Sequence, residues 1–242
     1  MLTGTINLTA DPSITLTYFV HEFSEEFPDR TILPAMLVIP GGGYEFCSDG
    51  ESEPIAMAYY AAGYQTFVLN YSTGNDKRWP MPLEEANLAI EIIIKNAKEW
   101  LVDTHKIAAI GFSAGGHLAA SLSTMGTIRP AAVVLAYPCI LDSINEILAF
   151  PVSDLTDKVD DETSPAFIFA TRTDDLVPIA NSLAYAAALD EAGRPFEIHI
   201  FAEGPHGFSL GTAFTAAGRD GYVLPDASKW FDLSLKWLET VL

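Results

Sequence analysis

Seven short segments rich in β-branched and aromatic residues recur along the chain, and segments with helical periodicity lie between most of them. The predicted strands are ITLTYFVHEF (14–23), PAMLVIP (34–40), QTFVLNYS (65–72), KIAAIGF (106–112), AAVVLAYP (131–138), PAFIFATR (165–172) and FEIHIFAEG (196–204). The predicted helices cover 51–62, 83–100, 114–124, 178–192 and 226–241. Because the strands show little polar alternation and helices separate them, we expect an α/β fold with a mostly parallel central sheet and helices on both faces.

Residues that favour helix ends support these boundaries. Ser48 followed by Glu51 forms a capping-box pattern, which predicts the start of the first helix. Pro82 and Pro178 suit the first turns of two later helices, because the amide that proline lacks would be unpaired there. Gly193 favours the end of the helix that Pro178 opens.

The length and composition favour one globular domain. The chain has 242 residues, 49% of them apolar, and no linker-like run, low-complexity tract or repeat divides them. We therefore expect a single domain over residues 1–242. The segment at about 139–164 has the character of a short cap-like insertion, because it is polar at SDLTDKVDDETS and too short for a large helical cap.

The charge balance argues against several classes of partner. Thirteen basic residues against 32 acidic ones leave a net charge of −19, which would repel phosphate backbones and anionic lipids. The start of the sequence, MLTGTINLTADPS, lacks the basic and apolar regions of a secretion signal. We expect a cytosolic protein with no nucleic-acid or membrane partner, and a homo-oligomer is compatible with the sequence.

Two cysteines do not form a metal-binding pattern. Cys47 and Cys139 lie far apart in the chain, and in a reducing compartment both are expected to be free thiols. The sequence gives no reason to expect a metal or an organic cofactor.

A nucleophile pattern follows one of the predicted strands. Gly111-Phe112-Ser113-Ala114-Gly115 matches G-x-S-x-G between the strand KIAAI and the helical segment HLAASLSTM. A serine on such a sharp turn has a strained backbone, and a Cβ at either glycine would collide across the turn. The new helix also directs its free amides at the serine, so the amide of Ala114 could stabilise an oxyanion. An incidental serine in a glycine-rich turn is the alternative interpretation.

Among the five histidines, one lies where a general base is needed. His206 follows the strand FEIHIF, at the carboxyl edge of the predicted sheet where ligands of such folds collect. His199 lies within that strand, and His117 lies on the helix after Ser113, where a structural hydrogen bond is its expected role. His21 and His105 lie near the ends of predicted elements, far from any catalytic pattern.

Two aspartates are candidates for orienting the base. Asp174 and Asp175 follow the strand PAFIFAT, and either could face the histidine loop while the other caps the next helix. The order serine, aspartate, histidine, each on a loop after its own strand, is the chain order of the α/β-hydrolase triad.

A further loop with three glycines follows the strand AMLVI. In PGGGY, Pro40 precedes Gly41, Gly42 and Gly43. A dinucleotide-binding pattern would need a third glycine where Phe46 stands, and a P-loop would need a Gly-Lys pair that is absent here, so both nucleotide interpretations fail.

Taken over almost its whole length, the sequence resembles the α/β-hydrolase superfamily, and in particular its small acetyl esterase branch related to acetylxylan and other carbohydrate esterases. The matching segments are PGGGY with SDGESEPIA, NYS, WPMPLEEANLAIEII, IAAIGFSAGGHLAA and TDDLVPIANSLAYAAALDEAGRPFEIHIFAEGPHGF. The resemblance implies Ser113 as nucleophile, His206 as base and Asp174 as acid, with Asp175 as the alternative acid. It also implies a fold with little or no cap.

One position departs from the family pattern. Many relatives carry a histidine before the glycines of the oxyanion loop, and this chain carries Pro40. The donors are backbone amides, so their role survives, and we expect Gly42, Gly43 and Ala114 to form the oxyanion hole with Tyr44 behind them.

These motifs predict a serine carboxylesterase for short-chain esters, acetyl esters in particular, whose alcohol portion the resemblance suggests is a sugar or a xylo-oligosaccharide. Aromatic residues that could stack on that alcohol are Tyr44, Tyr71, Trp79 and Phe208, although each could equally be core or rim. The alternatives are a serine peptidase of the prolyl-oligopeptidase type and a non-catalytic binding protein built on the same fold.

Overall fold

The computed structural model describes residues 1–242 and contains eight strands in one sheet. The strands are β1 (Leu2–Asn7), β2 (Thr15–Val20), β3 (Leu33–Ile39), β4 (Gln65–Asn70), β5 (Val102–Phe112), β6 (Ala132–Ala136), β7 (Ala166–Thr171) and β8 (Phe196–Phe201). Their order is β1-β2-β4-β3-β5-β6-β7-β8, with β1 and β2 antiparallel and β3 to β8 parallel to one another. The expected α/β fold is therefore confirmed.

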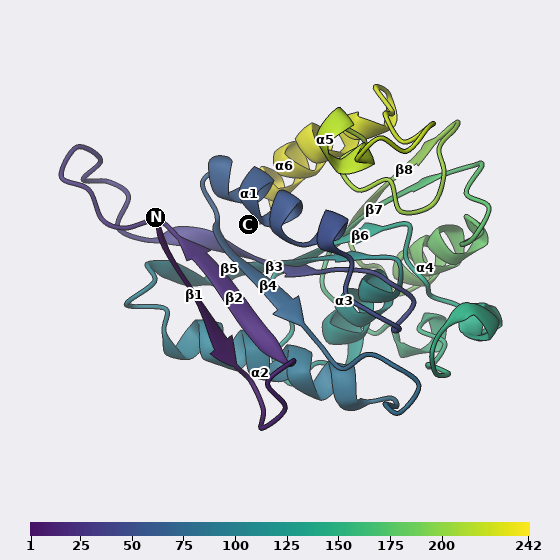
Figure 1. Cartoon of the computed structure of the whole chain (residues 1–242), viewed down its shortest axis with the longest axis horizontal. Coiled ribbons are helices and arrows are strands. Elements are labelled where there is room, and N and C mark those ends of the chain that lie inside the picture. The colour runs from purple at the N-terminus through teal and green to yellow at the C-terminus, as the bar shows by residue number, and fades with distance from the viewer.

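Helices cover both faces of this sheet (Figure 1). The helices are α1 (Glu53–Ala61), α2 (Met81–Lys95), α3 (Ala114–Met125), α4 (Ala180–Glu191), α5 (Ala213–Ala216) and α6 (Trp230–Val241), and short 3₁₀ turns span Asp49–Glu51, Asp142–Ile147, Thr156–Lys158 and Ala227–Lys229. Buried residues of α2, α3 and α4 belong to one core cluster, and those of α1 and α6 belong to another on the opposite face. None of the helices is long and apolar enough to cross a lipid bilayer.

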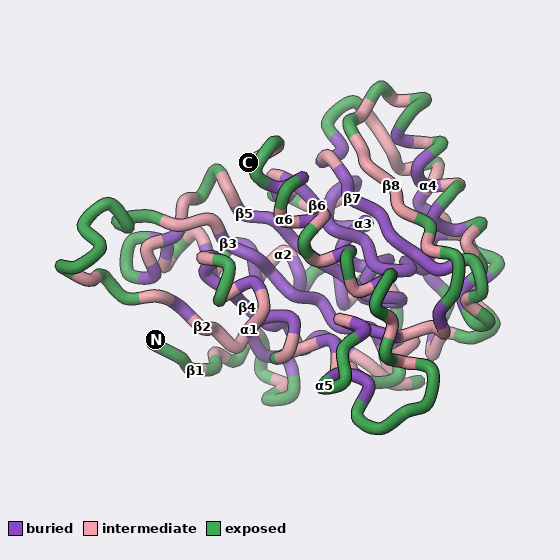
Figure 2. Tube along the Cα trace, turned by 90° about the horizontal axis from the view of Figure 1, so that it is seen from above, coloured by how far each residue is buried: buried purple, intermediate pink, exposed green.

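Alternate residues of the central strands contribute to the two cores. On β3, Leu37 and Ile39 lie in the cluster with α2 and α3, and Met36 and Val38 lie in the cluster with α1 and α6. Successive side chains of a strand point to opposite faces, so a strand covered on both sides must be apolar throughout. Figure 2 shows the result, with buried residues through the middle of the molecule and exposed ones in the outer loops.

The seven predicted strands are all present, but one strand was missed. The edge strand β1 has the sequence LTGTIN and is largely exposed, so it lacks the apolar run that marks the inner strands. Among the helices, α2 ends at Lys95, earlier than the predicted boundary at 100, and the four-residue α5 was not predicted.

The predicted helix-end signals have different outcomes. Pro82 lies in the first turn of α2, and Gly193, with φ +66°, follows the end of α4, as expected. Pro178 precedes the first residue of α4 by two positions. The capping box of Ser48 and Glu51 is wrong, because Ser48 makes no side-chain capping bond and α1 begins only at Glu53.

Substitution of a buried and of an exposed phenylalanine would test how much the core contributes to stability. Phe167 on β7 is fully buried against α6, and its ring centroid lies 5.9 Å from that of Trp237. We expect Phe167→Ala to lower the free energy of unfolding by about 3 to 5 kcal/mol, because it leaves a cavity between the sheet and the helix. Phe214 is 79% exposed, so Phe214→Ala should change that free energy by less than about 0.5 kcal/mol. Urea unfolding of both variants would measure the difference, and equal losses would contradict this description of the core.

Candidate active site

A strained turn between β5 and α3 carries Ser113. Its backbone has φ +53° and ψ −118°, outside the usual regions for a residue with a side chain. A Cβ on Gly111 would lie 2.1 Å from the carbonyl oxygen of Gly115, and a Cβ on Gly115 would lie 2.2 Å from that of Ile39. The predicted strain and the predicted need for both glycines are therefore confirmed.

The structure brings Ser113, His206 and Asp174 together. Ser113 Oγ lies 2.8 Å from His206 Nε2, and His206 Nδ1 lies 2.7 Å from Asp174 Oδ2. A carboxylate only accepts, so Nδ1 carries the proton, and Nε2 is left to accept from the serine hydroxyl. The arrangement can remove a proton from Ser113 and stabilise the imidazolium that results.

The environment of Asp174 suits an orienting acid. Its side chain is only 1% exposed, and its Oδ1 accepts hydrogen bonds from the amides of Leu176 and Val177 at 3.0 and 2.8 Å. These two hydrogen bonds hold the carboxylate in one orientation, with Oδ2 directed at His206. The neighbouring Asp175 is exposed, and it is Asp174 that bonds His206 Nδ1, so the geometry favours Asp174 over the alternative.

The glycine loop after β3 lies beside this serine. Gly42, Gly43 and Tyr44 have positive φ values of 123°, 63° and 60°, and no protein acceptor is bonded to their amides. Ala114 is the first residue of α3, so its amide has no partner within the helix. The loop and the helix start together offer unpaired donors close to Ser113, as an oxyanion hole requires.

A pocket of about 290 Å³ opens over the triad. Ser113, His206 and both Gly42 and Gly43 line it, together with Glu45, Phe46, Ser48, Glu51, Ile147, Leu148, Leu176, Gly207 and Arg219. The insertion at 139–164 reaches this pocket through Ile147 and Leu148, and the amide of Ala149 donates to Gly43 O at 2.9 Å. The insertion contains only two short 3₁₀ turns and no cap helix.

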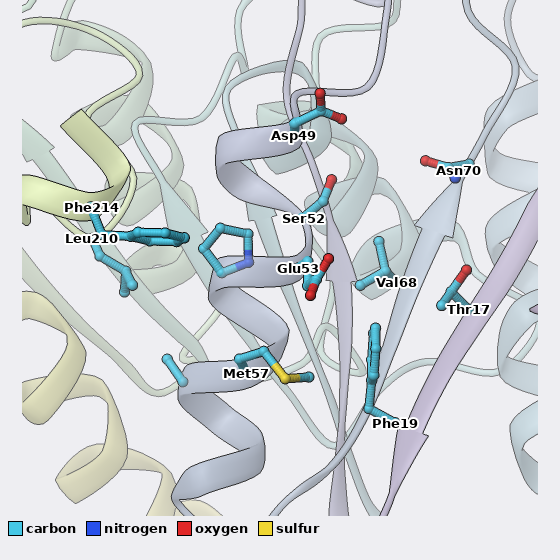
Figure 3. Close-up of a pocket in the computed structure, with 12 residues that line it drawn as sticks. Thr17, Phe19, Asp49, Ser52, Glu53, Met57, Val68, Asn70, Leu210 and Phe214 are labelled. Carbon is cyan, nitrogen blue, oxygen red and sulfur yellow. The ribbon is translucent and has the colours of Figure 1, made fainter. Parts of the chain in front are cut away.

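A larger cavity of about 790 Å³ lies beside α1 (Figure 3). Phe19, Met57 and Phe214 contribute its apolar surface, while Asp49 and Glu53 contribute carboxylates. It contains no triad residue and neither Gly42 nor Gly43, so the smaller pocket is the one that can carry the chemistry.

The expected stacking residues do not present free faces to a ligand. Tyr44 and Phe208 are 0% exposed and Tyr71 is 2% exposed, so their rings belong to the core. Tyr71 instead donates from its hydroxyl to Pro40 O at 2.6 Å, below the glycine loop. Trp79 is partly exposed but packs edge-on against His117 and does not line the pocket. The stacking hypothesis is therefore wrong for the three buried rings, because the sequence could not distinguish rim from core.

His117 has the structural role expected of it. It is fully buried, its Nδ1 accepts from the Tyr44 hydroxyl at 2.9 Å, and its Nε2 donates to Ser153 O at 2.9 Å. Burial lowers the pKa of its imidazole to about 4, because the charged form is poorly solvated there. His199 pairs with Glu197 on β8, at 2.6 Å, away from the triad.

Sequence reasoning missed a buried polar residue in the pocket wall and its hydrogen-bond partners. Glu51 is 4% exposed and accepts hydrogen bonds from the Gly41 amide at 3.0 Å and from the Tyr137 hydroxyl at 2.6 Å. Burial raises the pKa of this carboxyl, and the Tyr137 hydrogen bond and the nearby His206 oppose that rise. The segment SDGESEPIA did point to the region, but the residue was interpreted as a helix cap.

Comparisons with known proteins are consistent with this geometry. Residues 26–132 match the BD-FAE family, and residues 142–219 match the prolyl oligopeptidase family. The chain is 43% identical to an α/β-hydrolase enzyme from a Medee basin deep-sea metagenome library, with a TM-score of 0.94, covering 100% of this chain and 98% of that one. This chain belongs to the α/β-hydrolase family. The resemblance and the fold inferred from the sequence are therefore confirmed.

Two curated relatives are longer proteins. The chain is 36% identical over 205 residues to an endo-1,4-beta-xylanase B of Butyrivibrio fibrisolvens, covering 72% of this chain and 32% of that protein. It is 28% identical over 250 residues to an acetylxylan esterase of Xylanibacter ruminicola, covering 93% of this chain and 49% of that protein. The matched part of the chain thus spans about a third of the length of the first relative and about half of the second.

The buried imidazole of His117 makes stability depend on pH. Its pKa is about 4 in the folded state and about 6.5 when unfolded, so the unfolded state binds the proton more tightly and stability falls as the pH drops from about 6.5 to 4. The difference corresponds to at most about 3.4 kcal/mol. His117→Gln keeps one acceptor and one donor without titrating, so its free energy of unfolding should decline less over this range. Urea unfolding at pH 7 and pH 5 would test this, and equal pH dependence in both proteins would contradict it.

Proposed function

We propose that this chain is a serine carboxylesterase that hydrolyses short-chain esters through an acyl-enzyme. The observation that carries the proposal is the continuous hydrogen-bonded series from Ser113 through His206 to Asp174, with distances of 2.8 and 2.7 Å. The serine hydroxyl is a weak nucleophile until a base takes its proton, and this series provides that base in the required tautomer.

The proposed reaction has two halves. Ser113 Oγ attacks the ester carbonyl as His206 Nε2 takes its proton, and the imidazolium then gives that proton to the departing alcohol. A water molecule next attacks the acyl-enzyme, again losing a proton to His206, and the carboxylic acid leaves while Ser113 regains its hydroxyl. Asp174 stabilises the imidazolium in both halves without taking up the proton itself.

The oxyanion of each tetrahedral intermediate is expected to bind at the unpaired amides. We assign the donors to Gly42, Gly43 and Ala114, the residues that the sequence indicates. The absence of competing protein acceptors at Gly42 and Gly43 supports this assignment. Such preorganised donors stabilise charge that exists only during the reaction, and each contributes about 3 to 4 kcal/mol to lowering the barrier in comparable enzymes.

The size of the pocket supports a short acyl group. Its volume of about 290 Å³ is at the small end of ligand sites, and Ile147, Leu148 and Phe46 narrow it. An acetyl group needs little apolar space, whereas a long acyl chain needs an extended apolar channel. We therefore assign acetyl esters as the preferred substrates.

The alcohol portion is proposed to be a sugar or a xylo-oligosaccharide. The names of the two curated relatives, an acetylxylan esterase and a xylanase, support this class of substrate. Glu45, Ser48 and Arg219 add polar groups to the pocket wall that could bind hydroxyls. With Tyr44, Tyr71 and Phe208 buried, recognition of the sugar would depend on these polar groups.

A second candidate is a peptidase of the prolyl-oligopeptidase type. The match of residues 142–219 to that family favours it, and this segment includes Asp174 but not Ser113. Cleavage of an amide bond uses the same triad, but the leaving nitrogen must be protonated as it departs. Aminoacyl and peptidyl 4-nitroanilides therefore distinguish the peptidase from the esterase. Release of 4-nitroaniline at rates comparable with ester cleavage would favour the peptidase.

The triad assignment predicts unequal effects of neighbouring substitutions. Ser113→Ala should lower kcat for 4-nitrophenyl acetate by at least about 1,000-fold, and Asp174→Asn by about 1,000- to 10,000-fold, because the imidazole loses its acceptor. The matched control is Asp175→Asn, an exposed neighbour, which should leave kcat within about twofold. Ordinary turnover by Ser113→Ala would refute the proposed mechanism.

The pocket volume predicts a steep dependence on acyl length. Among 4-nitrophenyl esters, kcat/KM should be highest for acetate and fall by at least about tenfold at octanoate, since each added methylene needs space that the pocket lacks. Acetylated sugars and xylo-oligosaccharides, assayed by acetate release, then test the alcohol portion. Faster cleavage of octanoyl esters than of acetyl esters would show that the acyl assignment is wrong.

A further inference from the structure

A buried carboxylate links three loops of the catalytic site. Glu51 Oε2 accepts from the Gly41 amide, and Oε1 accepts from the Tyr137 hydroxyl. The Tyr137 oxygen in turn accepts from the Ser209 amide at 3.0 Å. Gly41 begins the glycine loop, Tyr137 follows β6, and Ser209 lies three residues after His206, so the three segments converge on one side chain and its partner.

Burying this carboxylate costs free energy that its hydrogen-bond partners must offset. No lysine, arginine or histidine lies within ion-pair distance of Glu51, so two neutral donors must compensate for the loss of water. A Cβ on Gly41 would lie 2.7 Å from Glu51 Oε2, so the carboxylate also requires a glycine at this position. The carboxylate and the glycine loop are therefore in direct contact.

The same network contains backbone strain. Tyr137 and Ser209 have positive φ values of 37° and 53°, which residues with side chains rarely adopt. The Ser209 hydroxyl donates to Gly50 O at 2.6 Å, and Trp230 Nε1 donates to Ser209 O at 2.9 Å. Strained residues persist where surrounding contacts determine them, and here those contacts connect the histidine loop with the turn that carries Glu51.

The network also touches the base itself. The ring of Tyr137 lies edge-on to that of His206, with centroids 4.9 Å apart and planes at 67°. A Cβ on Gly207 would lie 3.9 Å from Glu51 Oε1, which places the carboxylate next to the histidine loop.

We propose that Glu51 is a positioning residue of the catalytic site, which holds the glycine loop through Gly41 and the histidine loop through Tyr137. It does not contact the reacting atoms. Its two hydrogen bonds hold the unpaired amides of Gly42 and Gly43 and the imidazole of His206 in one arrangement around Ser113. The proposal rests on the proposed esterase function.

Glu51→Gln is the main test, because it keeps the shape and removes the charge. The amide oxygen can accept from the Gly41 amide, but the amide N–H group then faces the Tyr137 oxygen, so the Tyr137 hydroxyl proton loses its acceptor. We expect kcat for 4-nitrophenyl acetate to fall by about 10- to 100-fold, with KM changed by less than about threefold, because loop misplacement affects the transition state most. The control is Asp160→Asn, which removes a hydrogen-bonded carboxylate whose partners Arg129 and Thr163 do not line the pocket.

The reaction with a fluorophosphonate separates positioning from a loss of stability. In folded Glu51→Gln, the rate at which a fluorophosphonate labels Ser113 should fall by about 10- to 100-fold, because this reaction also needs the base and the oxyanion donors in one arrangement around the serine. That rate should stay within about twofold of the parent protein in Asp160→Asn.

Tyr137→Phe provides an independent test should Glu51→Gln fail to fold. Removing the hydroxyl breaks the link to both Glu51 and Ser209, so kcat should again fall by about 10-fold or more. The double variant should lose less than the product of the two single losses, because both act through the same loops. A kcat within about twofold of the parent protein for Tyr137→Phe, or for folded Glu51→Gln with an unchanged rate of labelling by a fluorophosphonate, would overturn the proposal.

These outcomes are distinct from failure of the proposed function. If Ser113→Ala retains turnover, the triad assignment fails whatever Glu51 does. If Ser113→Ala is inactive and a fluorophosphonate labels Ser113 at the same rate in Glu51→Gln as in the parent protein, only the positioning role fails.

Discussion

The close approach of the β5–α3 turn to the end of β3 is the constraint on which the site depends. A Cβ on Gly115 would lie 2.2 and 2.3 Å from the carbonyl oxygens of Ile39 and Pro40, so no side chain is possible there. β3 and β5 are neighbours in the parallel sheet, and their carboxyl ends therefore meet at one edge. This contact brings the glycine loop against Ser113. With a larger gap between the turn and the end of β3, the amides of the loop would not reach the serine.

At this edge of the sheet, the residues with strained backbone angles are held by rigid strands and helices. Ser113 lies between the longest strand, β5, and the first residue of α3, and Tyr137 follows the fully buried strand β6. Ser209 lies on a loop after β8 but is tied to Trp230, whose ring stacks on Phe169 at 4.4 Å. Each unfavourable φ thus depends on burial of neighbouring strands and of α6, which connects the stability of the core with the geometry of the pocket.

The strong signals in the sequence come from residues whose conformation or burial is decided locally. The inner strands are apolar because both faces are covered, and the turn around Ser113 needs its glycines whatever lies beyond it. The weak signals come from contacts between distant segments. Glu51 resembles a helix cap within its own segment, and only Tyr137, 86 positions away, shows where its carboxylate points. The burial of Tyr44 and Phe208 likewise depends on the whole fold, so an aromatic residue near a motif is weak evidence for a binding face.

Pro40 shows that different residues can hold a catalytic loop in place in related proteins. Where many relatives have a histidine side chain before the glycines, this chain holds the loop from below through the Tyr71 hydroxyl on Pro40 O, at 2.6 Å, and the Glu51 carboxylate on the Gly41 amide, at 3.0 Å. Both partners are buried, so water does not compete for these bonds. Pro40, the residue that departs from the family pattern, therefore stands where two other residues can replace the function of a side chain. The glycines that follow it have no substitute, because their role depends on the backbone.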